Sequence, residues 1–180
     1  MATFKFTGRV LPSSSNMTLK GSISTRWEDP SLGLAMDASL SIANSVVEVL
    51  CESNLFGTEN HDGHVHFRAS DMARAVVNSF AYAKGLGLSV VLESVTKPDG
   101  VKYNIQDQRP DLAALVTAFR SGPEHGSVDL ADMLQIVFSD PMIFVSLNDL
   151  VSSITLPQYA PVNCGRVIEA LPLPQPCDPR

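Results

Sequence analysis

Residues 17–42 read MTLKGSISTRWEDPSLGLAMDASLSI, and apolar and polar residues alternate through most of this stretch. The alternation is interrupted at Asp29-Pro30-Ser31 and resumes at Leu34. A period of two is typical of β-strands, because successive side chains of a strand point to opposite faces. The stretch therefore predicts two strands, over 17–27 and 34–43, in an antiparallel sheet. One face of such a sheet is apolar and covered (the dry face), and the other is polar and solvated (the wet face).

The rest of the first half carries further strand patterns around one helical pattern. Strands are expected over 3–11 and 46–51, and short connections favour a meander of the first four strands. The segment 53–64 is polar and is expected to be a loop, with 65–67 either a short strand or the lead-in to a helix. A helix is predicted after Ser70, which is a good N-cap, and ends at Gly85. Strands over 88–95 and 101–105 then flank a tight turn at 97–100.

The second half changes to a period of three to four residues, which indicates helices over 111–120, 128–138, 142–154 and 162–171. The expected fold class is α+β: an N-terminal antiparallel meander sheet of about five or six strands with one inserted helix, and C-terminal helices packed on one face. We expect one domain over 1–171, strand-rich over 1–105 and helical over 111–171. The tail 172–180 has a proline at nearly every second position, which predicts a flexible extended end. Either it is a natural terminus, or it replaces a longer last helix.

Composition excludes several classes of function. The chain has 180 residues, a net charge of −6, 44% hydrophobic and 18% charged residues, as in ordinary globular proteins. Lys and Arg are scattered, which disfavours nucleic-acid binding and a basic membrane-surface helix. The sequence contains no apolar run of about 18 residues and no secretory signal pattern. Three widely spaced cysteines fit neither a disulfide framework nor a zinc module, so we expect a cytoplasmic protein.

One histidine-rich segment is the candidate metal site. His61, His64 and His66 lie within six residues, and Asp62 or Glu59 would add a carboxylate. If 64–66 is extended, His64 and His66 share a face and are placed to ligate one transition metal. The alternative is a polar turn around Asp62-Gly63 with solvated histidines. The hypothesis of a metal site lacks a further ligand at a recognisable spacing.

Two other groups of residues are candidates for chemistry or binding. Cys164 lies near the start of a predicted helix beside Arg166, where a thiol pKa is lowered, but it also fits a core position; Cys51 fits a core position better. The wet face of the first sheet strands is rich in small hydroxyls and carries two cations, so it is either plain solvated surface or a candidate binding face. The residues of that candidate face are Lys20, Ser22, Ser24, Arg26, Ser39 and Ser41.

These patterns favour a non-enzymatic cytoplasmic protein that acts by binding an unknown ligand, either as a self-associating homo-oligomer or as an accessory subunit, so its partner is another protein or a second copy of itself. No P-loop, dinucleotide-binding or nucleophile-elbow motif occurs in the sequence. No cofactor is expected under this interpretation, and neither nucleic acid nor membrane is a partner. The alternative is a metal-dependent enzyme that uses the His61, His64 and His66 cluster.

Overall fold

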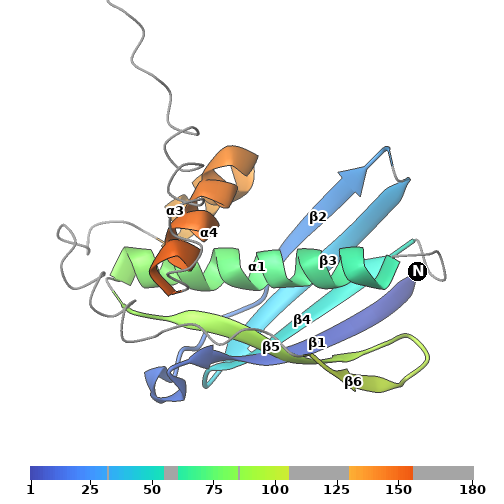
Figure 1. Ribbon diagram of the computed structural model, residues 1–180, viewed down its shortest axis with the longest axis horizontal. Helices are drawn as coiled ribbons and strands as arrows, with labels where there is room; N and C mark the ends of the chain where they lie inside the picture. The colour runs from blue at the N-terminus through green and yellow to red at the C-terminus, as the bar shows by residue number, and fades with distance from the viewer. Residues whose placement is uncertain (32, 55–60, 85, 106–129, 156–180) are drawn as a thin grey trace, which may run out of the picture.

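The computed structural model describes residues 1–31, 33–54, 61–84, 86–105 and 130–155, with side chains up to Val151 in the last range. Within these residues one six-stranded sheet has the order β2-β3-β4-β1-β5-β6, and every pairing is antiparallel (Figure 1). The elements are β1 (Ala2–Leu11), the 3₁₀ turn η1 (Ser13–Ser15), β2 (Ile23–Asp29), β3 (Leu34–Ala43), β4 (Val46–Ser53), α1 (His61–Lys84), β5 (Ser89–Thr96), β6 (Lys102–Asn104), α3 (Leu130–Ser139) and α4 (Pro141–Thr155).

The α+β class, the antiparallel sheet, the inserted helix and the C-terminal helices are confirmed. The strand order adds one feature that short connections do not reveal. β2, β3 and β4 follow one another as a meander, whereas β1 lies between β4 and β5 instead of beside β2. The first strand therefore forms the centre of the sheet and is paired along both sides.

The strand predicted over 17–27 is shorter than expected, because β2 begins at Ile23. The residues before β2 instead lie alongside the turn between β3 and β4. Met17 is buried, its N–H donates to Ser45 Oγ at 3.0 Å, and the N–H of Leu19 donates to the carbonyl of Ile42 at 2.9 Å. Asn44 and Ser45 both have positive φ, as a two-residue hairpin turn requires. The alternation thus predicted the strand correctly from Ile23 onward, whereas 17–22 is not part of any strand.

Helix α1 begins at His61, well before the predicted start after Ser70, and 65–67 is helical rather than a strand. The apolar spacing that predicted the later turns continues backwards through Ala69 and Val65 to His61, all of them buried. Gly63 and the polar residues around it hid this continuation in the sequence. Asp62 lies in the first turn and Lys84 in the last, where each charge interacts favourably with the helix dipole.

Helix α1 covers the dry face of the sheet, where it contacts β1, β3, β4 and β5 (Figure 1). The dry face carries large apolar side chains such as Phe4 and Phe6, each 1% exposed. The helix meets them partly through Ala69 and Ala73, whose small side chains let helix and sheet approach closely. This layer forms the main hydrophobic core and leaves the wet face on the opposite side.

α3 and α4 pack against α1, and Asn78 of α1 donates to Asn148 of α4 at 3.0 Å. Both helices agree with the predictions over 128–138 and 142–154 to within a few residues. No single described helix is both long and apolar enough to cross a membrane, and α3 and α4 together are bent by 113°. The helices predicted over 111–120 and 162–171, the tail 172–180 and the candidate Cys164 lie outside the described residues.

Candidate functional site

A shallow hollow of about 500 Å³ lies on the wet face over β2, β3 and β4. The three strands are held in register by their ladders, which place Ser24 opposite Ser39 and Ser39 opposite Leu50. Outward-facing side chains from neighbouring strands therefore lie side by side, and no loop is needed to bring them together. The lining residues are Ser24, Thr25, Arg26, Asp37, Ala38, Ser39, Leu50 and Glu52.

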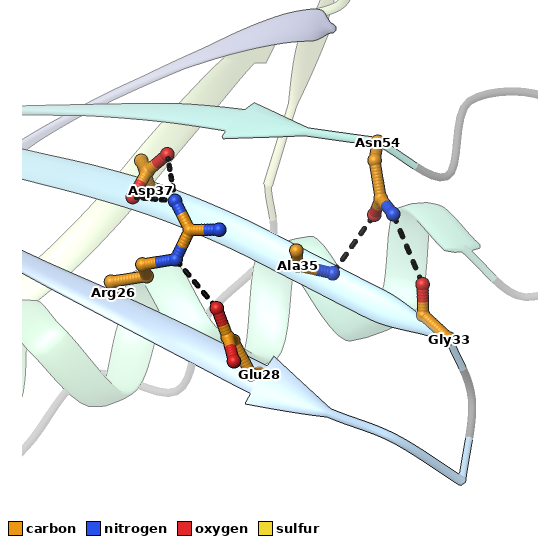
Figure 2. A network of polar contacts seen from close by, with 6 residues as sticks. All are labelled: Arg26, Glu28, Gly33, Ala35, Asp37 and Asn54. Atoms are coloured by element: carbon orange, nitrogen blue, oxygen red, sulfur yellow. Dashed lines mark hydrogen bonds and ion pairs between the residues drawn. The ribbon is translucent and has the colours of Figure 1, made fainter.

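Arg26 lines this hollow and is held there by two carboxylates (Figure 2). Its Nε donates to Glu28 Oε1 at 2.8 Å, and its Nη1 lies 3.2 and 3.1 Å from the two carboxylate oxygens of Asp37. The hydrogen bond to Glu28, followed by the charge of Asp37, raises the pKa of the guanidinium further above its ordinary value. The side chain of Arg26 is nevertheless 53% exposed, so the network orients its outer face toward solvent rather than burying it.

A second set of hydrogen bonds fixes the β2–β3 hairpin that carries Arg26 (Figure 2). Asn54, just after β4, accepts from the N–H of Ala35 at 2.9 Å and donates to the carbonyl of Gly33 at 3.0 Å. At the turn itself, Asp29 accepts from the N–H of Ser31 at 3.0 Å. Side chains on this hairpin are therefore held in place before any partner arrives, which lowers the entropy cost of binding.

The hollow contains an excess of negative charge. Asp37 lies directly opposite Glu52 in the β3–β4 ladder, and like charges in such positions repel. Arg26 compensates Asp37 on the other side, whereas Glu52 has no ion pair within the part of the chain that the structure describes. The hollow is therefore suited to accept a cationic group beside Glu52.

The structure unites three of the six predicted residues of the binding face. Ser24, Arg26 and Ser39 line the hollow, while Ser41 lies further along β3 opposite Glu48. Lys20 and Ser22 are exposed but precede β2 and do not line the hollow.

Sequence reasoning missed the contribution of β4. Leu50 and Glu52 line the hollow, although the compact apolar run 46–51 favours a more buried strand. In the structure Val46 is 59% and Leu50 37% exposed, while Val47, Val49 and Cys51 are fully buried. Apolar residues on both faces removed the alternation from β4; Glu48 and Glu52, four apart, were the remaining signal of its wet side.

Elsewhere on the wet face, polar and charged side chains pair with one another. Lys5 Nζ lies 2.6 Å from Glu48, and Arg9 makes two contacts with Glu93, at 2.7 and 2.9 Å. The hydroxyl groups of Thr7 and Ser94 are 2.6 Å apart. The side chains in these pairs already have ion-pair or hydrogen-bond partners. The region over β1 and β5 therefore leaves fewer polar groups available to a partner than the hollow does.

The three clustered histidines are separated by the helix that contains them. His61 is 3% exposed and its ring meets Phe4 edge-on, with ring centroids 5.5 Å apart. His66 stacks on Phe6 at 5.8 Å, whereas His64 is exposed to solvent. No group of three or more His, Cys, Asp or Glu side chains within the described ranges is arranged to hold a metal ion. The shared metal site gains no support there and stays a prediction.

His61 has a different set of partners, which the sequence did not predict. Its Nε2 is 2.8 Å from Ser53 Oγ, and its Nδ1 is 3.9 Å from Asp62 Oδ1. Burial lowers the pKa of the imidazole, against the opposing charge of Asp62, which favours the neutral form. Asp62 in turn pairs with Lys97, which lies 4.8 Å from the Tyr103 ring centroid. This ties the start of α1 to the β5–β6 hairpin.

The order Ser53, His61, Asp62 resembles a nucleophile, base and carboxylate only superficially. The distance of 3.9 Å between imidazole and carboxylate exceeds a hydrogen bond, and Ser53 is fully buried. A substrate carbonyl has no route to that hydroxyl through the described residues. We assign the Ser53–His61 contact to the anchoring of α1 on β4. Cys51 is also fully buried, and burial raises the pKa of its thiol to about 12, which makes it unreactive.

Residues 4–105 match the model of a family described as the N-terminal domain of a domain of unknown function, DUF8168. The chain belongs to this family. The matched region covers more than half of the 180 residues and contains all but the first two residues of β1, the whole of β2 to β6, the complete hollow and helix α1. Searches of curated proteins and of solved structures gave no match.

Proposed function

We propose that this DUF8168 protein is a non-enzymatic binding protein of the cytoplasm, which holds a protein partner on the wet face of its sheet and associates with itself. The observation that carries the proposal is the hollow over β2, β3 and β4, which combines an oriented Arg26, a Glu52 carboxylate without an ion pair among the described residues, and the half-exposed Leu50. Together these groups offer a hydrogen-bonding fork, a negative charge and an apolar contact within one surface.

The shape of the hollow favours a protein segment over a small metabolite. Small-molecule sites enclose most of their ligand in a concave, largely apolar pocket. This hollow is shallow and lies open on a sheet face, with polar groups on three strands. A partner segment with a Lys or Arg beside an apolar side chain would pair with Glu52 and contact Leu50, so we expect binding that weakens with salt.

A photo-cross-linking experiment tests this function. A photoreactive amino acid replaces Ser39 inside the hollow, and in a matched variant it replaces the exposed turn residue Asp99. The proposal predicts a discrete adduct from position 39 and none from position 99. The cross-linked protein, once identified and purified, is expected to bind the full chain with at least tenfold lower affinity after Glu52→Gln. Equal adducts from both positions, or an affinity unchanged by Glu52→Gln, would overturn it.

A further inference from the structure

The sheet has two edges of different character. β6 at one edge has three residues, whereas β2 at the other has seven residues and contains no proline. β2 pairs with β3 along one side and has no neighbouring strand on the other within the described residues. A straight edge strand of this length presents backbone N–H and C=O groups to another chain. The β2 edge is therefore the place where the sheet is open to extension.

The dry side of β2 is also incompletely covered. Trp27 and Ile23 are half-buried, whereas their cross-strand partners Met36 and Leu40 are fully buried. The reason is visible in Figure 1, where α1 lies over the middle of the sheet and β2 extends beyond it. Apolar surface is thus left at the open edge, and a further strand there would remove it from water.

Charge decides which occupant fits this edge. On its wet side β2 presents Arg26 and Glu28, with side chains 53% and 63% exposed. Such charges oppose pairing with an arbitrary strand. They favour pairing with an antiparallel copy of the same strand if its register places Arg26 opposite Glu28, because the two-fold axis then creates that contact twice.

Three registers place the two-fold axis near the middle of β2. They differ in which side chains of the two copies lie opposite each other. A two-fold axis through Arg26 sets the two guanidinium groups opposite each other. An axis through Thr25 sets Arg26 opposite Ser24 of the second copy. An axis through Trp27 sets Arg26 opposite Glu28 of the second copy, twice, on the wet side, and brings the two Trp27 side chains together on the dry side.

We infer that the occupant of the β2 edge is a second copy of this chain, paired antiparallel about a two-fold axis through Trp27. This inference specifies the self-association included in the proposed function. Since the axis of an antiparallel pair stands perpendicular to the sheet, the two wet faces lie on the same side of the dimer. The two hollows then lie beside each other, so one dimer presents both to a partner.

The test measures the mass of the full chain by light scattering over a range of protein concentrations. Each single charge reversal, Arg26→Glu or Glu28→Arg, is expected to weaken dimerisation at least tenfold. The double variant R26E/E28R restores the opposite charges in this register and is expected to regain most of the affinity. The matched control is the swap K5E/E48K, an exposed ion pair between β1 and β4 away from the edge, which should leave the dimer unchanged.

Trp27 supplies an independent readout, because it is the single tryptophan in the sequence. Its fluorescence emission is expected to shift to the blue, and its quenching by acrylamide to fall, over the concentration range in which the mass doubles. Thermal unfolding of each variant confirms that its fold is retained.

Three results would overturn the inference. They are a chain that stays monomeric at every concentration, a dimer unaffected by the single reversals, and a double variant no better than either single one. None of these three results changes the cross-linked adduct that is expected from position 39. A wrong dimer register can therefore be distinguished from a wrong partner-binding surface.

Discussion

The two faces of the sheet are made from alternate residues of the same strands, yet different forces stabilise them. Along β1, Phe4 and Phe6 are each 1% exposed on the dry face, while the Lys5 side chain between them is 45% exposed on the wet face. The dry face gains free energy from burial under α1, whereas the wet face is arranged through ion pairs and hydroxyl contacts. Stability is thus concentrated on one face, and the other is free to serve binding.

The largest expected effect of a single substitution is on the dry face. Phe6→Ala removes a fully buried ring that also stacks on His66, and should lower the free energy of unfolding by about 3–5 kcal/mol. Chemical denaturation measures this loss. The control is Lys5→Ala, the adjacent wet-face residue, for which a change within about 0.5 kcal/mol is expected. Similar losses from both variants would contradict the division between the faces.

The next effect is steric and lies at the bulge between β1 and β5. A Cβ on Gly8 would lie 2.1 Å from the carbonyl oxygen of Val91 and 2.8 Å from Leu92 Cα, and backbone there cannot move aside cheaply. Gly8→Ala should therefore destabilise the fold by about 1–3 kcal/mol or more. Gly21→Ala, which meets nothing within 4 Å, is the control and should leave the melting temperature almost unchanged.

A smaller effect concerns pH and the imidazole of His61, which is buried against Phe4 of β1. Burial lowers the pKa of His61 in the folded state below the ordinary value of 6.5. Between the two pKa values the unfolded chain binds more protons, so the contribution of His61 is complete above about pH 6.5 and declines as the pH falls toward the folded pKa. Unfolding experiments across this pH range should show that the free energy of unfolding declines as the pH falls. The decline should be smaller in His61→Asn. An identical pH dependence in both proteins would refute it.

The smallest effect is expected on the wet face. A double-mutant cycle on Lys5 and Glu48, whose charged atoms are 2.6 Å apart but well exposed, should give a coupling energy of about 0.2–1 kcal/mol. The coupling should decrease as salt is added, because exposed charges are screened. A coupling of several kcal/mol that resists salt would mean that this face is covered and not free for a partner.

The comparison of the faces also explains which site residues could be predicted. Ser24, Arg26 and Ser39 were found because β3 has its polar residues on one side only and β2 alternates closely enough to continue that pattern. Leu50 and Glu52 were missed because Val46 and Leu50 add apolar side chains to the wet side of β4, which weakens the period of two. The histidines were grouped by closeness in sequence, but at about 100° per residue a helix directs His66 about 160° away from His64 and about 140° away from His61, so the three side chains do not converge on one point.

The sequence by itself determined the class of the fold, the two faces of the sheet and the positions of most strands, because side-chain alternation is a local property of the chain. Only the tertiary structure decided that β1 lies between β4 and β5 and that Gly8 must lack a side chain beside Val91. It also decided that residues of three strands form one hollow. Each of these features depends on contacts between residues far apart in the chain, which local periodicity does not encode.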